Sequence, residues 1–178
     1  MSELWHKHLR PMFKYIEQNY DLTIPLKGIE IGVKGGRNAY YILTGLPIKI
    51  LYLIDCYDEK CLQYKPIMEQ EILNKYPEKT HFIYKKSIDA INDVPKDLDF
   101  VYIDSDHTYE TTKNEIKLYY EKVRKGGILG GHDYGIKDIE IAVQEFVQKN
   151  KLKLYIKYDR FDPDSKTKRA IDWWVIKQ

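Results

Sequence analysis

Acidic and imidazole side chains follow two short apolar runs in this 178-residue sequence. Asp104, Asp106 and His107 follow the first run, and His132 and Asp133 follow the second. If the runs are neighbouring parallel strands, their ends meet at one edge of a sheet, and the carboxylates of Asp104 and Asp133 can face one ion. Oxygen ligands suit magnesium, calcium or manganese, and an added imidazole favours manganese, iron or zinc. We therefore expect a divalent-cation site here, with His132 as the third ligand.

The same side chains fit two other interpretations. An ion lowers the pKa of a bound hydroxyl and a nearby base takes its proton, so this edge could perform acid–base chemistry. Alternatively, Asp104 or Asp106 caps the helix that follows. His107 and His132 are then structural histidines held by hydrogen bonds.

A glycine-rich turn follows an earlier apolar run. Gly32, Gly35 and Gly36 would let the backbone approach a ligand closely. Glu30 lies inside the run, where a carboxylate is costly unless a cationic ligand group or the amides of the turn pair with it. Asp55 ends the next run, about twenty residues on, where such folds place an acid on ribose hydroxyls. The turn therefore predicts a nucleotide-like ligand; a plain tight turn with a strand-end cap is the simpler alternative.

Short apolar runs alternate with amphipathic stretches, which predicts a mostly parallel sheet flanked by helices. Strands are expected at 28–33, 48–55, 81–84, 98–104 and 127–131, and helices at 4–20, 37–43, 62–75, 109–125 and 139–149. Two last strands, 153–158 and 171–176, have only a polar loop between them, so they form an antiparallel hairpin. Within the final strand, Trp173 would face the core or the opposite surface, and Trp174 the other. The fold class is an α/β three-layer sandwich with a mostly parallel seven-stranded sheet that ends in an antiparallel C-terminal hairpin.

Length and composition predict one domain over 1–178, with an N-terminal helix in 1–20 and the core in 27–178. The net charge is +2 and the charges are interleaved, so we expect neither a nucleic-acid nor a membrane partner. No leader-like or membrane-spanning apolar segment is expected, and two cysteines suit free thiols, which favours a cytoplasmic protein. A homo-oligomer is an open alternative.

The segment 29–36, IEIGVKGG, resembles the first motif of class I S-adenosylmethionine-dependent methyltransferases. The segments 100–110, FVYIDSDHTYE, and 125–134, KGGILGGHDY, are similar to the small-molecule methyltransferases that include the macrocin-type sugar O-methyltransferases. The resemblance extends from about Lys27 to the end of the chain. It implies a Rossmann-like methyltransferase fold, S-adenosylmethionine as cofactor, and metal-assisted O-methylation of a small hydroxylated acceptor such as a sugar.

By position, the resemblance implies cofactor contacts for Glu30, Gly32, Gly36, Asp55, Ser87, Ile88 and Asp104. The methionine part would lie at the first three, the ribose at Asp55 and the adenine along the turn 87–89.

The resemblance also implies roles for the acids and histidines. In metal-assisted relatives, the positions of Asp104, His132 and Asp133 hold a divalent cation, which here would be magnesium or manganese. Asp106 matches the general base of the sugar enzymes, and His107 stands where catechol-type relatives carry a base lysine. His132 departs from the pattern because it replaces a carboxylate.

Two other functions compete with this interpretation. A nicotinamide-dependent oxidoreductase shares the strand-end acid, but the terminal hairpin and the missing GxGxxG motif argue against it. A non-catalytic cofactor-binding module is the second, and the convergent acids argue against that.

Overall fold

A computed structural model describes residues 8–159 and 171–178. Its centre is a seven-stranded sheet of order β3-β2-β1-β4-β5-β7-β6. The strands are β1 (Leu26–Ile31), β2 (Ile48–Ile54), β3 (Thr80–Ile83), β4 (Leu98–Ile103), β5 (Val123–Gly131), β6 (Tyr155–Tyr158) and β7 (Ile171–Ile176). The first five pair in parallel, whereas β7 is antiparallel to both β5 and β6. The predicted fold class, including the terminal hairpin, is confirmed.

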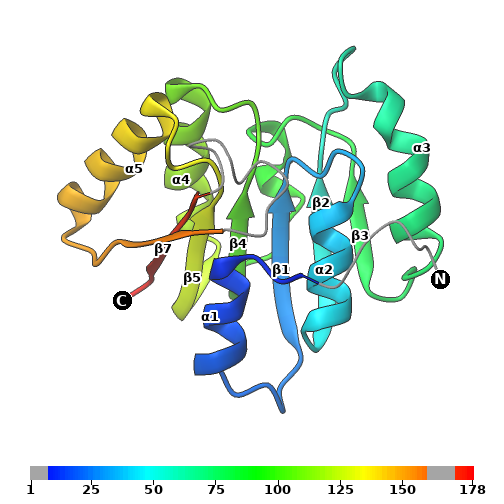
Figure 1. Cartoon of the computed structure of the whole chain (residues 1–178), viewed down its shortest axis with the longest axis horizontal. Helices are drawn as coiled ribbons and strands as arrows, with labels where there is room; N and C mark the ends of the chain where they lie inside the picture. Colours follow the sequence, from blue (N-terminus) through cyan, green and yellow to red (C-terminus); the bar gives the residue numbers. More distant parts are fainter. Residues whose placement is uncertain (1–7, 160–170) are drawn as a thin grey trace.

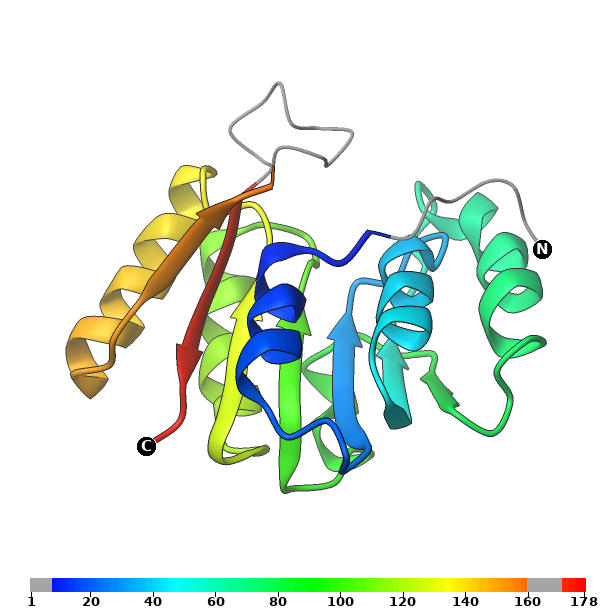
Figure 2. The ribbon, with the colours of Figure 1, turned by 60° about the horizontal axis from the view of Figure 1, so that its bottom comes forward.

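Helices cover both faces of the sheet. The longer ones are α1 (Pro11–Asn19), α2 (Arg37–Gly45), α4 (Tyr109–Tyr120) and α5 (Lys137–Asn150). Between β2 and β3 the chain winds through η1 (Leu62–Tyr64), α3 (Lys65–Met68) and the π-helical turn η2 (Glu69–Leu73), and η3 (Asp89–Asn92) precedes β4. Figures 1 and 2 show α1, α2 and α3 on one face and α4 and α5 on the other. Among the described helices, none is long and apolar enough to cross a membrane.

Alternating side chains of the strands supply two cores, one for each face. In β4, Phe100 and Tyr102 pack with α1 and α2, while Val101 packs with α4 and α5. Trp173 and Trp174 also point to opposite faces, as expected, but both are buried, with exposed fractions of 1% and 4%. The expectation that only one tryptophan faces a core is wrong because helices cover both sides of β7.

Three predicted helices are shorter in the structure. The helix expected at 62–75 is divided into η1, α3 and η2 and ends at Leu73. The helix expected at 4–20 begins at Pro11, because a proline suits the first turn of a helix, where its missing N–H costs no hydrogen bond. Residues 1–7 lie outside the described part. The helix expected at 109–125 ends at Tyr120, since Val123 already pairs with Leu98 in the sheet. Most of the polar loop expected at 159–170 lies outside the described residues.

The parallel strands end in register, and this positions the site. Ile31 at the end of β1 pairs with Ile54 of β2 and with Ile103 of β4. Ile103 in turn pairs with Gly131 at the end of β5. The four segments that leave these strands therefore start at one edge of the sheet, where open α/β sheets hold their ligands.

Candidate functional site

The glycine-rich turn that contains Gly32, Gly35 and Gly36, which we call the glycine loop, packs tightly against the turn after β4. Gly32 has a φ of +83°, and a Cβ there would overlap the backbone carbonyl oxygen of Asp104. This backbone contact alone requires glycine at position 32, and the predicted cofactor contact of Gly32 stays a prediction. Gly36 is the N-cap of α2 and has a φ of +81°. Gly35 alone among the three is open, with nothing within 4 Å of an added Cβ.

Asp55 closes the glycine loop from the adjacent strand. One carboxylate oxygen accepts hydrogen bonds from the backbone N–H groups of Val33 at 2.9 Å and Lys34 at 2.8 Å. The other accepts one from Tyr57 N at 2.8 Å. The simpler alternative, a strand-end acid that holds the turn, is therefore realised, and the ribose contact of Asp55 stays a prediction.

Glu30 is a buried carboxylate at the base of the loop. Its side chain is 1% exposed, and Oε1 accepts a hydrogen bond from Asn38 Nδ2 at 3.1 Å. Oε2 has no hydrogen-bond partner among the described residues. Burial raises the pKa of Glu30 to about 8, although Asn38 and the charge of Arg10 oppose the shift. A buried carboxylate oxygen without a donor suits a ligand that brings a positive charge.

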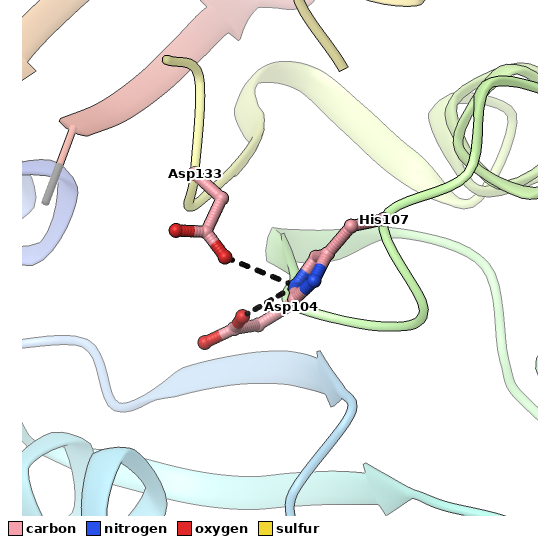
Figure 3. Close-up of side chains that lie close together, drawn as sticks. All are labelled: Asp104, His107 and Asp133. Carbon is pink, nitrogen blue, oxygen red and sulfur yellow. Dashed lines mark hydrogen bonds and ion pairs between the residues drawn. The ribbon is translucent and has the colours of Figure 1, made fainter. Parts of the chain in front are cut away.

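Three predicted residues converge at the ends of β4 and β5. His107 Nε2 lies 3.3 Å from Asp104 Oδ1 and 3.1 Å from Asp133 Oδ2. Figure 3 shows the imidazole between the two carboxylates. The three ligand atoms lie within 4.8 Å of one another, which suits a single metal ion. We call Asp104, His107 and Asp133 the acid–imidazole cluster.

Two members of the acid–imidazole cluster have left-handed backbone conformations. The φ of His107 is +64° and that of Asp133 is +60°. For residues other than glycine, a strained conformation of this kind costs about 1–3 kcal/mol of folding free energy, and such residues cluster at functional sites. The backbone thus gives up stability to place these two side chains.

The two acids of the cluster have opposite pKa shifts. Burial opposes ionisation of Asp104, but the Arg10 guanidinium and a hydrogen bond from His107 hold its pKa well below the usual range. Burial and the neighbouring charge of Asp104 raise the pKa of Asp133. Asp104 is therefore a fixed negative charge.

His132 does not occupy the place that the sequence analysis gave it. Its Nδ1 hydrogen-bonds to Asp172 Oδ1 at 2.8 Å, whereas its Nε2 lies 4.0 Å from Asp133 Oδ1. Burial disfavours its imidazolium, but the hydrogen bond to Asp172 and the charge of Asp104 outweigh this and raise its pKa. His107, rather than His132, completes the cluster with the two acids, and a metal role for any of these residues remains a prediction.

Asp106, the expected base, lies in the turn that starts α4. Its Oδ1 accepts hydrogen bonds from Thr108 N and Oγ1, each at 3.0 Å, and its Oδ2 accepts one from Thr111 Oγ1 at 2.9 Å. Thr108 itself is the N-cap of α4. Asp106 therefore braces the capping threonine and is not itself the cap that the alternative expected, and its role as a base stays a prediction.

The turn after β3 presents one buried and one exposed residue. Ser87 is buried, and its carbonyl accepts a hydrogen bond from Tyr119 Oη at 2.7 Å. Ile88 is 45% exposed. An exposed isoleucine is compatible with an adenine contact, and the contacts of Ser87 and Ile88 with the cofactor stay predictions.

Sequence reasoning missed Arg10, Tyr102 and Asp172, which lie behind the cluster. Arg10 Nη1 donates to Asp104 Oδ2 at 2.8 Å and to Tyr102 Oη at 2.9 Å, and Tyr102 Oη donates to Asp172 Oδ1 at 2.7 Å. Asp172 carried a usable signal, since it is an acid inside an apolar strand, as Glu30 is. Arg10 carried none, because its partners are remote in sequence.

Known proteins resemble the chain in sequence and in fold. Residues 29–134, more than half of the chain, match a family model described as a methyltransferase domain. An uncharacterised protein of Acanthamoeba polyphaga mimivirus is 32% identical over 83 residues, which are 46% of this chain and 37% of that protein. The chain thus spans well under half the length of this relative.

Solved structures share the whole architecture at low sequence identity. An O-methyltransferase from Bacillus cereus in complex with SAH has a TM-score of 0.69 and 15% identity, covering 98% of this chain and 84% of that one. A putative methyltransferase from Streptococcus mutans in complex with SAH has a TM-score of 0.67 and 19% identity, covering 96% of this chain and 99% of that one. An rRNA methylase from Streptococcus thermophilus has a TM-score of 0.67 and 15% identity, covering 93% of each chain. At these identities the likeness concerns the fold alone.

Proposed function

The chain belongs to the methyltransferase-domain family, and from this premise we propose that it transfers a methyl group from S-adenosylmethionine to a hydroxyl of a small molecule such as a sugar. The observation that carries the proposal is the convergence of Asp104, His107 and Asp133 at the sheet edge where the glycine loop lies. A cofactor at the loop and a polar acceptor at the cluster would then be neighbours.

The loop fits the proposed cofactor. Glu30 Oε2, buried and without a donor among the described residues, suits the amino cation of S-adenosylmethionine. Gly35 leaves open space beside the loop. The bound cofactor would supply an electrophilic methyl group on a sulfonium. The structural neighbours in complex with SAH support this choice.

The acid–imidazole cluster fits the proposed acceptor. A hydroxyl becomes a good nucleophile when a base takes its proton. His107 lies between two carboxylates, and their negative charge stabilises the imidazolium that forms when it takes a proton. We therefore assign the acceptor proton to His107 rather than to Asp106, whose oxygens serve the α4 turn.

The same three atoms also fit a divalent ion. Two carboxylate oxygens and one imidazole nitrogen form a donor set that favours manganese, iron or zinc over magnesium. An ion bound there would supply a Lewis acid that lowers the pKa of the acceptor hydroxyl. His107 would then be a ligand of the ion and not the base, so the two mechanisms are alternatives that the metal-dependence of the reaction distinguishes.

Calorimetry with SAH and with NAD tests the cofactor assignment. We expect binding of SAH and none of NAD; the opposite pattern would refute the proposed function. Methyl transfer is then measured on a panel of small hydroxylated compounds, including sugars, with an rRNA fragment as contrast and with EDTA or added manganese in parallel. Transfer to a small acceptor that is lost in an Asp104→Asn/Asp133→Asn variant supports the cluster, and transfer confined to RNA contradicts the acceptor class.

A further inference from the structure

Arg10 brings a positive charge to the acid–imidazole cluster from the N-terminal segment. It precedes α1, and its side chain is 9% exposed. Its Nη1 contacts Asp104 Oδ2, whereas His107 Nε2 contacts Asp104 Oδ1. The guanidinium of Arg10 thus holds one oxygen of Asp104, and the imidazole of His107 contacts the other.

A buried hydrogen-bond network fixes this guanidinium in place. Tyr102 of β4 accepts a hydrogen bond from Arg10 and donates one to Asp172 of β7. Asp172 also contacts His132 Nδ1 through Oδ1 and accepts a hydrogen bond from Met12 N at 3.0 Å through Oδ2. Segments from the start, the middle and the end of the chain therefore meet behind the cluster, and the guanidinium is not an adaptable surface charge.

We propose that Arg10 is a positioning residue that serves as the resident cation of the acid–imidazole cluster: it turns Asp104 Oδ1 toward His107 and Asp133, and it weakens the binding of a divalent ion there. This proposal rests on the proposed function, which makes the cluster the place where the acceptor binds. It follows from two observations: the two oxygens of Asp104 have different partners, and the side chain of Arg10 is buried.

Charge counting gives the direction of the effect. Two ionised carboxylates would match the charge of a divalent ion, but the guanidinium already offsets one of them. Arginine stays protonated in proteins, so this positive charge cannot be released when an ion arrives. An ion at the cluster would therefore lie close to a fixed like charge, and removal of that charge strengthens ion binding.

Manganese titration of the free protein tests the proposal without cofactor or turnover. Mn²⁺ affinity is measured by calorimetry and by electron paramagnetic resonance in the wild type and in Arg10→Met and Arg10→Lys. We expect Arg10→Met to bind Mn²⁺ about tenfold more tightly or better, and Arg10→Lys to stay near the wild type because it keeps the charge. The matched control is Arg124→Met, which removes a guanidinium paired with Asp99 at 2.7 Å at the opposite edge of the sheet.

Folding and cofactor binding are followed in parallel by circular dichroism and SAH calorimetry. Mn²⁺ affinity that is unchanged or weaker in folded Arg10→Met overturns the proposal, as does an equal gain in Arg124→Met. If Arg10→Met does not fold, Arg10→Gln keeps a donor toward Tyr102 and takes its place. If neither folds alone, refolding by Mn²⁺ supports the proposal and failure to refold overturns it. Loss of SAH binding in the wild type would instead refute the proposed function and leave the Mn²⁺ comparison intact.

Discussion

Gly32 lies so close to the backbone carbonyl of Asp104 that no side chain fits between them. The base of the glycine loop and the first acid of the cluster are therefore one packed unit. We expect Gly32→Ala to lower the free energy of unfolding by about 1–3 kcal/mol, because the alanine adopts a strained φ and its Cβ displaces the β4–α4 turn. Urea unfolding measures the change. A variant as stable as the wild type would show that the turn adapts freely.

Gly35 offers the matched substitution in the same loop. An added methyl group meets nothing within 4 Å, so Gly35→Ala should fold with wild-type stability. If the cofactor lies over the loop, the same methyl group occupies its space, and SAH affinity should fall about tenfold. Thermal unfolding and calorimetry measure the two effects separately. Unchanged SAH affinity would place the cofactor away from Gly35.

Glu30 should make stability depend on pH. Its carboxyl releases a proton near the ordinary pKa of 4.5 in the unfolded chain, but only at about 8 in the folded protein, because burial disfavours its charge. The stability that the neutral form contributes is thus complete below the first value and is lost as pH rises through the second. We expect Glu30→Gln to remove this decline, by several kcal/mol at the alkaline end. Urea unfolding at several pH values measures it, and identical slopes in both proteins would contradict the assignment.

The two histidines should respond differently to substitution. His107→Ala removes a donor of the acid–imidazole cluster, so methyl transfer and Mn²⁺ binding should each weaken at least about tenfold while the fold persists. His132→Ala leaves buried Asp172 with one partner fewer and should lower the free energy of unfolding by about 1–3 kcal/mol. Activity assays, Mn²⁺ titration and urea unfolding of both variants decide. If His132→Ala lost Mn²⁺ binding and methyl transfer while His107→Ala kept both, His132 would be the metal ligand that the sequence suggested.

Asp106 should act on the helix rather than on the reaction. Its three hydrogen bonds hold Thr108 and Thr111 at the start of α4, so Asp106→Ala should lower the free energy of unfolding by about 0.5–1.5 kcal/mol. Methyl transfer at saturating substrate should stay within a few-fold of the wild type. An inactive but fully stable variant would instead identify Asp106 as the base.

Local patterns were enough to predict the sheet, and strand ends were enough to predict which acids meet. Ile103 and Gly131 are paired, so Asp104 and Asp133, which follow close behind, had to lie near each other. What a side chain does at that edge depends on its rotamer and its partners. The sequence therefore assigned His132 to the metal site and His107 to proton transfer, although His132 turns to Asp172.

Long-range partners explain the remaining differences. Arg10 reaches Asp104 across 94 positions of the chain, and no periodicity or motif marks such a pair. The motifs also did not predict that the oxygens of Asp55 and Asp106 hold nearby backbone and threonine groups, and the ligand and catalytic roles assigned to these acids stay predictions. Local capping geometry is decided by the backbone path, which residue types alone leave open.

The strand order has a consequence for how the chain folds as it is synthesised. β7 is the last strand in the sequence but lies inside the sheet, between β5 and β6. During translation, β6 emerges from the ribosome before β7, the strand with which it pairs, and until β7 emerges one edge of β5 has no partner strand. Tyr102 and His132 likewise lack Asp172 until that strand arrives. The emergence of β7 therefore completes both the sheet and the support of the site, and nascent chains that stop before β7 would expose an unpaired strand edge that favours aggregation.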